Sequence, residues 1–299
     1  MELETLKMKN PILVTGATGT IGSLLVKALE SKPDVEVRAG VRNAAKAAGL
    51  RRGAVTPVDF DFDRPATHAA ALEGVRHVFL LPPMSPDPVA QGNAFVDAAR
   101  QAGVEHIVKL SSFGCEMEPG IQLGRWHRAV EKHIEATGIG FTFLRPNNFM
   151  SNFHLFAMPQ PDGSIFMPLG NGAVSYVDPR DIAEVAARTL MDAGHMGKAY
   201  TLTGPEALTV AQVAGQIAEV AKRSIKYVDV PETAARKAML DAHMPAWMVD
   251  AMMELHAIDK AGHASAIAPG VRDVLGRPAR RFADYSREHA ALWAKRSGS

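Results

Sequence analysis

The segment that decides the fold is Pro11-Ile12-Leu13-Val14-Thr15-Gly16-Ala17-Thr18-Gly19-Thr20-Ile21-Gly22. An apolar run comes first, three evenly spaced glycines follow, and residues 23–29 then have the pattern of an amphipathic helix. A strand, a tight turn and a helix N-terminus in this order can cradle a dinucleotide pyrophosphate, because the free N–H groups and the dipole of the helix favour an anion. The spacing is G-x-x-G-x-x-G rather than G-x-G-x-x-G, so the prediction depends on this context. The alternative is a glycine turn that joins any parallel strand to its crossover helix.

Strand-like and helix-like segments alternate along the first half of the chain. We expect strands, after the one that precedes the glycine turn, at residues 35–41, 54–60, 75–81, 106–110, 140–144 and 198–202. Pro57 marks its segment as an irregular or edge strand, because proline has no N–H to donate to a neighbouring strand. Strands separated by helical patterns are typical of βαβ units and a parallel sheet. The sequence therefore predicts an α/β fold with a Rossmann-type, doubly wound parallel sheet.

The pattern changes after residue 146. Residues 151–176 have a loop-like composition rich in Pro and Gly, and helical patterns dominate from about Gly204. We assign residues 1–154 to an NAD(P)-binding domain, to which residues 177–203 return, and residues 155–176 and 204–299 to a smaller, mainly helical substrate-binding lobe. Ligands of such folds bind beyond the carboxyl ends of the strands. We therefore expect the lobe to close over that edge as a cap.

Composition excludes several classes of protein. The 33 Lys and Arg residues balance the 32 Asp and Glu residues among 299 in total, which gives no basic surface for nucleic acid. No apolar run reaches the roughly 18 residues that span a bilayer, and the first residues lack the layout of a signal peptide. The single cysteine, Cys115, excludes an internal disulfide and fits a reducing compartment. We expect a cytoplasmic protein, monomeric or homodimeric, with no nucleic-acid or membrane partner and no catalytic metal.

The assembled motifs carry a resemblance. They are Val14–Gly22, Val41–Asn43, Phe79–Leu81, Ala102–Val108, Leu144–Pro146 and Asp178–Ala183. With these, the chain resembles the NmrA-like, atypical short-chain dehydrogenase/reductase family, and within it the triphenylmethane reductase and NADPH-quinone reductase branch. The likeness runs in order over roughly residues 10 to 290, which makes a chance motif match improbable. It implies an NAD(P)-binding Rossmann domain with a small substrate lobe.

The residue that follows the second predicted strand indicates which dinucleotide is bound. An NAD site usually has a carboxylate here, which accepts a hydrogen bond from the ribose 2′-hydroxyl. This chain has Arg42 instead, with Lys46 one helical turn further on. Cations at this place can hold a 2′-phosphate through charge-assisted hydrogen bonds. The sequence predicts NADPH over NADH; the alternative is that Arg42 only solvates the end of a strand.

Further cofactor contacts follow from the turn and from the resemblance. Within the turn, we expect contacts from Gly16, Thr18, Gly19, Thr20, Ile21 and Gly22. By position, the resemblance puts Asp61 and Phe62 beside the adenine, and Leu81 and Pro82 near the nicotinamide ribose. It puts Ser111 at the end of the fifth strand. It puts Pro146, Asn148 and Phe149 beside the nicotinamide. All of these follow predicted strands, where the fold places its ligand. Core packing is the alternative for Phe62 and Phe149.

The catalytic pair of ordinary short-chain dehydrogenases is missing. In the Tyr-x-x-x-Lys pattern the lysine lowers the pKa of the tyrosine, but here Leu123 stands at the tyrosine position and His127 at the lysine position. Hydride can still pass directly to an acceptor that delocalises charge, such as a quinone, a dye, an imine or an activated alkene. We take Ser111 and His127 as candidate catalytic residues. His127 would protonate the product or orient the nicotinamide, and Glu131, one turn further, would steady the protonated ring.

Three alternatives remain open at this point. His127 and Glu131 can be a solvated helix pair with no chemical role. The protein can be a regulator that senses the redox state by binding NADP(H) without turnover, as some NmrA-like proteins do. An isomerase or epimerase ranks below both, because such enzymes normally use the missing tyrosine.

The candidate substrate residues are apolar. Phe149 and Phe153 follow the sixth predicted strand, and Trp247 and Met248 begin a methionine-rich helical segment. Methionine adapts to irregular shapes and contacts aromatic rings well, which suits a lid over a planar apolar substrate. The alternative is that these residues pack the core of the small lobe.

Overall fold

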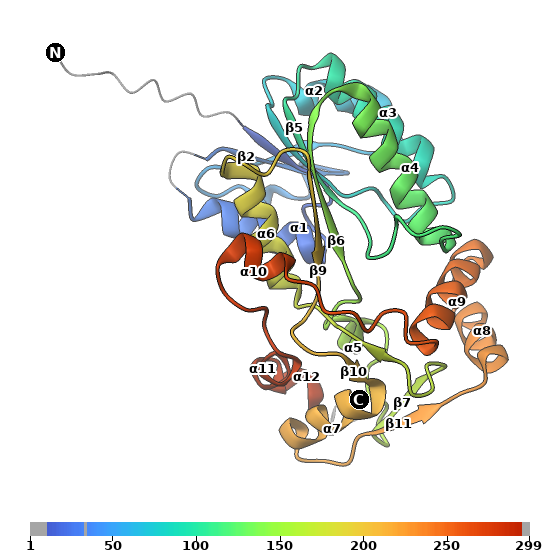
Figure 1. The fold of residues 1–299 in the computed structure, drawn as a ribbon. Coiled ribbons are helices and arrows are strands. Elements are labelled where there is room, and N and C mark those ends of the chain that lie inside the picture. Colours follow the sequence, from blue (N-terminus) through green and yellow to red (C-terminus); the bar gives the residue numbers. More distant parts are fainter. Residues whose placement is uncertain (1–10, 33–34, 295–299) are drawn as a thin grey trace. The chain divides into compact units, whose positions relative to one another are not determined.

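One seven-stranded sheet, in the order β3-β2-β1-β4-β5-β6-β9, forms the centre of the N-terminal part (Figure 1). Its strands are β1 (Ile12–Val14), β2 (Val37–Val41), β3 (Val55–Asp59), β4 (His77–Leu80), β5 (His106–Leu110), β6 (Gly140–Pro146) and β9 (Lys198–Leu202). The pairings from β3 through β6 are parallel. The strand order reverses between β1 and β4, as in doubly wound folds, and ligands bind at such a switch point. The predicted Rossmann-type sheet is confirmed.

The structure is a computed structural model that describes residues 11–32 and 35–294. Its contacts form two units, each described here by itself. The first unit comprises the described residues of Met1–Ser111 together with Trp126–Leu144 and Ile182–Tyr200. The second comprises Ser112–Arg125, Arg145–Asp181 and the described residues of Thr201–Ser299. Residues 112–125, 145–154, 177–181 and 201–203, which we assigned to the cofactor domain, thus belong to the second unit. Residues 1–10, where we expect no signal peptide, lie outside the described residues.

Helices cover both faces of the sheet. They are α1 (Thr20–Glu30), α2 (His68–Leu72), α3 (Pro88–Gln101), α4 (Gln122–Thr137) and α6 (Pro179–Met191), with short 3₁₀ turns η1 (Ala48–Leu50) and η2 (Pro65–Thr67). Figure 1 shows α3 and α4 on one side of the sheet and α1 and α6 on the other. Both faces of a parallel sheet are therefore covered, and β1 and β5 are buried along their whole length. Pro57 lies in β3, which is an edge strand, as its missing N–H predicts.

One hydrophobic cluster joins the sheet to α3 and α4. Phe95 and Val96 from α3 and Val130 and Ile134 from α4 pack on buried strand residues such as Ile107. Gly92 permits this approach, because a Cβ there would lie 2.9 Å from a methyl group of Val130. The close contact between α3 and α4 thus depends on a residue without a side chain.

The second unit is helical with short strand pairs. Its elements are α5 (Asn152–Leu155), β7 (Ser164–Met167), β8 (Ala173–Val174), β10 (Leu208–Thr209), α7 (Val210–Ala221), β11 (Lys226–Asp229), α8 (Glu232–Asp241), α9 (Ala246–Lys260), α10 (Gly270–Leu275), α11 (Phe282–Glu288) and α12 (Ala290–Trp293). A capping box begins α7: Thr209 accepts from the backbone of Gln212, whose side chain accepts in return. A separate hydrophobic cluster, which includes Phe153, Tyr176 and Phe282, forms the core.

The loop-like interpretation of residues 151–176 is wrong in part. The segment contains the short helix α5 and the strands β7 and β8. β7 pairs with β11 and β8 pairs with β10, so both partners lie far along the chain. Strands this short carry little local pattern, and tertiary pairing decides them.

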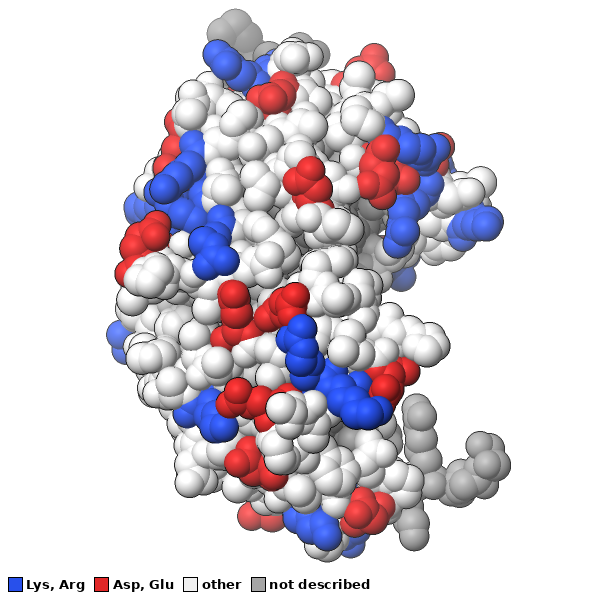
Figure 2. Space-filling model, turned by 90° about the vertical axis from the view of Figure 1, so that its right-hand side faces the viewer, with Lys and Arg blue, Asp and Glu red and all other residues white. Residues whose placement is uncertain are grey.

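Charge is mixed on the surface. Figure 2 shows Lys and Arg side chains interspersed with Asp and Glu on the face drawn, with extensive uncharged surface between them. Among the described residues, no helix has the length and apolar character needed to cross a membrane.

Candidate functional site

The glycine turn after β1 is built for close approach to its backbone. Gly16 has a φ of +63°, which favours glycine, and the N–H of Gly19 donates to its carbonyl at 2.9 Å. A Cβ on Gly22 would lie 2.1 Å from the carbonyl oxygen of Gly16, so only glycine fits at this position in the first turn of α1. The first turn of α1 contains no acidic residue. Its unpaired N–H groups and dipole therefore fit a pyrophosphate.

Thr15 joins the turn to the neighbouring strand. Its hydroxyl donates to the carbonyl of Phe79 at 3.1 Å and accepts from the N–H of Leu81 at 2.8 Å. The side chain of Leu81 reaches 3.2 Å from the place that a Cβ of Gly16 would take. Leu81 and the following Pro82 are thus held beside the glycine turn, at the carboxyl end of β4.

A cleft of about 470 Å³ opens beside the turn. It is lined by Thr18 from the turn and by the segment after β2: Val41, Arg42, Asn43, Lys46, Ala47, Gly49 and Leu50. None of these lining residues is acidic, and the side chains of Arg42 and Lys46 are exposed. A cleft with two cations beside a phosphate-binding turn fits a dinucleotide that carries a third phosphate on its ribose.

Local hydrogen bonds shape the segment that carries these cations. Asn43 accepts from the N–H of Lys46 at 3.0 Å, a side-chain bond with the spacing of an N-cap. The carboxylate of Asp59, at the end of β3, accepts from the N–H of Ala44 at 2.8 Å. This acidic side chain therefore binds the backbone and stays outside the lining of the cleft.

Asp61 and Phe62 lie after β3 in the same unit. Asp61 pairs with Arg64 at 3.2 Å, and Arg64 also donates to the carbonyl of Arg42 at 3.2 Å. Phe62 packs edge-on against Phe60 and Phe95, with ring centroids 4.8 and 5.7 Å apart. Its ring is half-buried against the core cluster, so the packing interpretation of Phe62 has direct support.

Ser111 and His127 meet through a residue that the motifs did not single out. Lys109, fully buried on β5, donates from Nζ to Nδ1 of His127 at 3.0 Å and to Oγ of Ser111 at 3.3 Å. Ser111 is itself fixed, since its N–H donates to the carbonyl of Leu144 at 2.7 Å. The two candidate catalytic residues and one lysine therefore form a single polar cluster in the first unit. The signal for Lys109 in the sequence is a lysine that follows Ile107 and Val108 in a predicted strand.

The lowered pKa of His127 argues against the hypothesis that Glu131 steadies a protonated ring. Burial, and then the positive charge of Lys109, lower the pKa of His127 well below its usual value, so its imidazole is neutral. Glu131 is buried and forms an ion pair with Arg128 at 3.0 Å. Spacing along the helix predicted that His127 and Glu131 share one face. It could not identify Lys109, the cation that lies beside His127.

The remaining cofactor candidates lie in the second unit. Pro146 is buried, and its carbonyl accepts from the N–H of Phe113 at 2.9 Å. Asn148 donates from Nδ2 to Asp259 at 3.1 Å, and burial raises the pKa of this carboxyl to about 7. Phe149 is half-buried and forms a single bridge to Val177. Asp259, on α9, is thus the polar partner of Asn148, and no local motif indicated it.

The candidate substrate residues divide into two kinds. Phe153 is 1% exposed and packs edge-on against Tyr176 and Phe282, with centroids 5.0 and 5.5 Å apart. These contacts favour the core-packing alternative for Phe153. Trp247 and Met248 are half-buried at the start of α9, which suits either a lid or a packing role.

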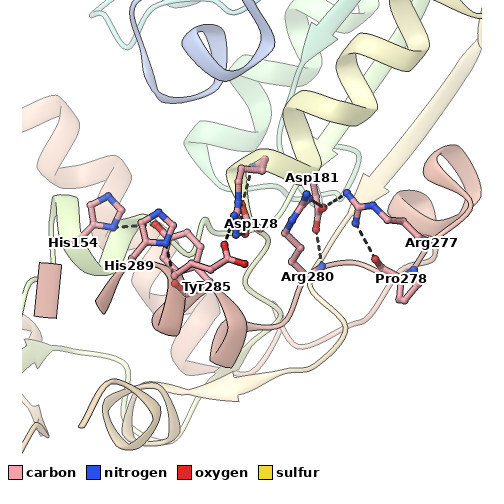
Figure 3. Close-up of polar contacts among 10 residues, drawn as sticks. His154, Asp178, Asp181, Arg277, Pro278, Arg280, Tyr285 and His289 are labelled. Atoms are coloured by element: carbon pink, nitrogen blue, oxygen red, sulfur yellow. Dashed lines mark hydrogen bonds and ion pairs between the residues drawn. The ribbon is translucent and has the colours of Figure 1, made fainter. Parts of the chain in front are cut away.

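The motif Asp178–Ala183 has a structural role in the second unit. Figure 3 shows Asp181 between Arg277 and Arg280. Its buried carboxylate accepts from the Arg277 guanidinium at 2.8 Å and from the N–H of Arg280 at 2.8 Å. Asp178, also buried, pairs with Arg180 at 2.6 Å. The motif thus fastens the start of α6 to the chain that follows α10.

Within the described residues, no group of three or more His, Cys, Asp and Glu could hold a metal ion.

Comparison with known proteins agrees with this geometry. The model of the NmrA-like family matches residues 8–272. An NAD(P)H azoreductase from Xenophilus azovorans is 40% identical over 94% of this chain and 99% of its own length. The NADPH complex of the Escherichia coli quinone oxidoreductase QOR2 superposes with a TM-score of 0.84, at 26% identity over 93% of this chain and 99% of that one.

Two further structures are similar. The Citrobacter sp. triphenylmethane reductase complexed with NADP(H) has a TM-score of 0.83 at 27% identity, over 94% of this chain and 99% of that one. The negative transcriptional regulator NmrA in complex with NADP has a TM-score of 0.75 at 18% identity, over 95% and 96% of the two chains. At that identity the second likeness shows the fold alone.

Proposed function

This chain belongs to the NmrA-like family, and we propose that it is an NADPH-dependent reductase of a small, apolar, aromatic or conjugated acceptor. Quinones, azo and cationic dyes, imines and activated alkenes form the acceptor class. The observation that carries the proposal is the cleft beside the glycine turn, lined by Arg42 and Lys46 and by no acidic residue. A related azoreductase that matches nearly the whole chain supports the same chemistry.

The residues would hold the dinucleotide in four places. Backbone N–H groups at the start of α1 would bind the pyrophosphate, and the absence of a Cβ on Gly22 leaves the turn tight enough. Arg42 and Lys46 would pair with the 2′-phosphate. Leu81 and Pro82 would contact the nicotinamide ribose, as would Ser111 at the end of β5. Asp61 and Phe62 would lie beside the adenine.

When bound, NADPH supplies the hydride, and the protein supplies position and polarity. Ser111 and His127 are the proposed catalytic residues. The neutral imidazole of His127 would donate a hydrogen bond to the acceptor atom that gains electron density, as a neutral histidine can do. Such acceptors delocalise the added charge, so no tyrosine is required at the position of Leu123. Pro146, Asn148, Phe149, Trp247 and Met248 remain proposed contacts to nicotinamide or substrate.

A redox-sensing regulator is the alternative function. It would bind NADP(H) through the same turn and cleft without turnover. The polar cluster of Lys109, Ser111 and His127 at the end of β5 favours the reductase, because a binding-only protein needs no oriented donor there. We further propose a cytoplasmic protein, monomeric or homodimeric, that prefers NADPH to NADH.

Titration of the purified protein with NADPH and NADH tests the proposal, followed by NADPH oxidation with quinones, azo and triphenylmethane dyes, imines and activated alkenes. We expect tight NADPH binding and turnover of at least one acceptor class. Tight binding without turnover on every acceptor would favour the regulator. No binding of either dinucleotide would refute both functions.

A further inference from the structure

Lys109 is an unusual residue for its place in the sheet. It lies in β5, whose five residues are all buried, and its own side chain has no exposed area. Burial of an ammonium group is costly unless hydrogen bonds compensate it. The acceptors of its Nζ include Nδ1 of His127 at 3.0 Å, Oγ of Ser111 at 3.3 Å and the carbonyl of Leu110 at 3.3 Å. The first two belong to the proposed catalytic residues.

The contact with His127 determines the form of its ring. An ammonium group has only donors, so the Nδ1 atom 3.0 Å away must be an acceptor without a proton. A neutral imidazole carries one proton, and that proton is then on Nε2. The nearby charge of Lys109 also disfavours a second proton on the ring. The same contact therefore selects both the tautomer and the neutral state.

The other groups around His127 do not oppose this selection. Arg128, the next residue on α4, directs its guanidinium to Glu131 at 3.0 Å and to Glu135 at 2.8 Å. Ser111 is a neutral hydroxyl that shares the same lysine. The His127 side chain is half-buried, and no hydrogen bond to Nε2 is seen among the described residues. Its Nε2–H is thus available to a ligand.

We infer that Lys109 is a positioning residue of the reductase, which holds His127 as a neutral imidazole with its Nε2–H available to donate to the hydride acceptor. The inference rests on the proposed function. It adds to that function a device that fixes the donor before substrate arrives. Preorganised donors act without reorganisation during the reaction, which is the main way in which dipoles lower a barrier.

Nuclear magnetic resonance of the unmodified protein gives a direct test. The ring nitrogens of His127 are observed with ¹⁵N-histidine labelling, and His127→Gln assigns their signals by difference. We expect Nε2 to be protonated and Nδ1 to be unprotonated, with no change between about pH 6 and 8. A ring that is protonated on Nδ1, or one that titrates near pH 6.5, overturns the inference.

Variants test the consequence for the reaction. Lys109→Met is expected to lower kcat by about 10–100-fold, the range for removing a group that orients a functional histidine. A protonation step should appear in the pH profile of kcat at a higher pH than in the unmodified protein, because the charge of Lys109 no longer lowers the pKa of His127 while burial still does. Lys109→Arg, which keeps a charged donor, should restore a flat profile. Lys132→Met removes an exposed lysine from α4, the helix that carries His127, and is the control.

The two proposals fail in distinguishable ways. Absence of NADPH oxidation by the unmodified protein with every acceptor refutes the reductase. Unchanged kcat and an unchanged pH profile in folded Lys109→Met refute the role of Lys109 while the reductase stands. If Lys109→Met does not fold, the ring-nitrogen measurement on the unmodified protein still decides the tautomer.

Discussion

Arg42→Ala separates recognition of the 2′-phosphate from recognition of the rest of the dinucleotide. The side chain is exposed and lines the cleft beside the glycine turn, and none of the other lining residues is acidic. A hydrogen bond to a charged group contributes about 1.5–3 kcal/mol, and solvent exposure puts Arg42 near the lower end. Since about 1.4 kcal/mol is a factor of ten, the Kd for NADPH should rise about 10- to 30-fold. Lys46 retains part of the attraction.

The assay is fluorescence titration of each variant with NADPH and with NADH, at low and at high salt. The Kd for NADH should stay within about twofold, because NADH lacks the phosphate that Arg42 would bind. The loss with NADPH should shrink at high salt, as expected for exposed charges. Arg51→Ala is the control, since Arg51 is exposed nearby but does not line the cleft. An equal loss for both dinucleotides, or no loss for either, would refute the assignment of Arg42.

Three other predictions concern the scaffold. Gly22→Ala should weaken NADPH binding at least about tenfold and lower the unfolding free energy by about 1–3 kcal/mol, because the new Cβ would lie 2.1 Å from a backbone oxygen. NADPH titration and urea unfolding measure the two effects. Gly215→Ala, which has open space around it, is the control. Burial lowers the pKa of His106 to about 4, so the stability that its neutral ring contributes is complete above pH 6.5 and is lost as pH falls toward 4; in urea unfolding, His106→Gln should reduce the loss of unfolding free energy between about pH 7 and 5 by about 2 kcal/mol. Asp181→Asn should lower the unfolding free energy by about 3 kcal/mol, because the buried carboxylate pairs with Arg277; an unchanged urea midpoint would show that the pair contributes little.

Local patterns were enough to predict the glycine turn and most of the sheet. These patterns are glycines at fixed spacing, buried apolar runs and a proline at an edge. Each is a property of neighbouring residues and predicts one kind of local structure. Arg42 was found in the same way, because its distance from the turn along the chain fixes its place after β2. Pattern failed for β7 and β8, whose pairing partners lie far away in the sequence.

By itself, the sequence determined the strand, glycine turn and helix that predict a dinucleotide site, and it showed that the usual tyrosine is missing, since both depend on residues within a few positions of each other. The partner of His127 was decided only by the tertiary structure. Lys109 stands 18 residues earlier, and the sequence alone indicated Glu131, the neighbour on the same helix face. Burial, and then the positive charge of Lys109, lower the pKa of His127 and so reverse the protonation state that the sequence suggested. The contact between β5 and α4, which joins residues far apart in the sequence, could therefore be found only in the tertiary structure.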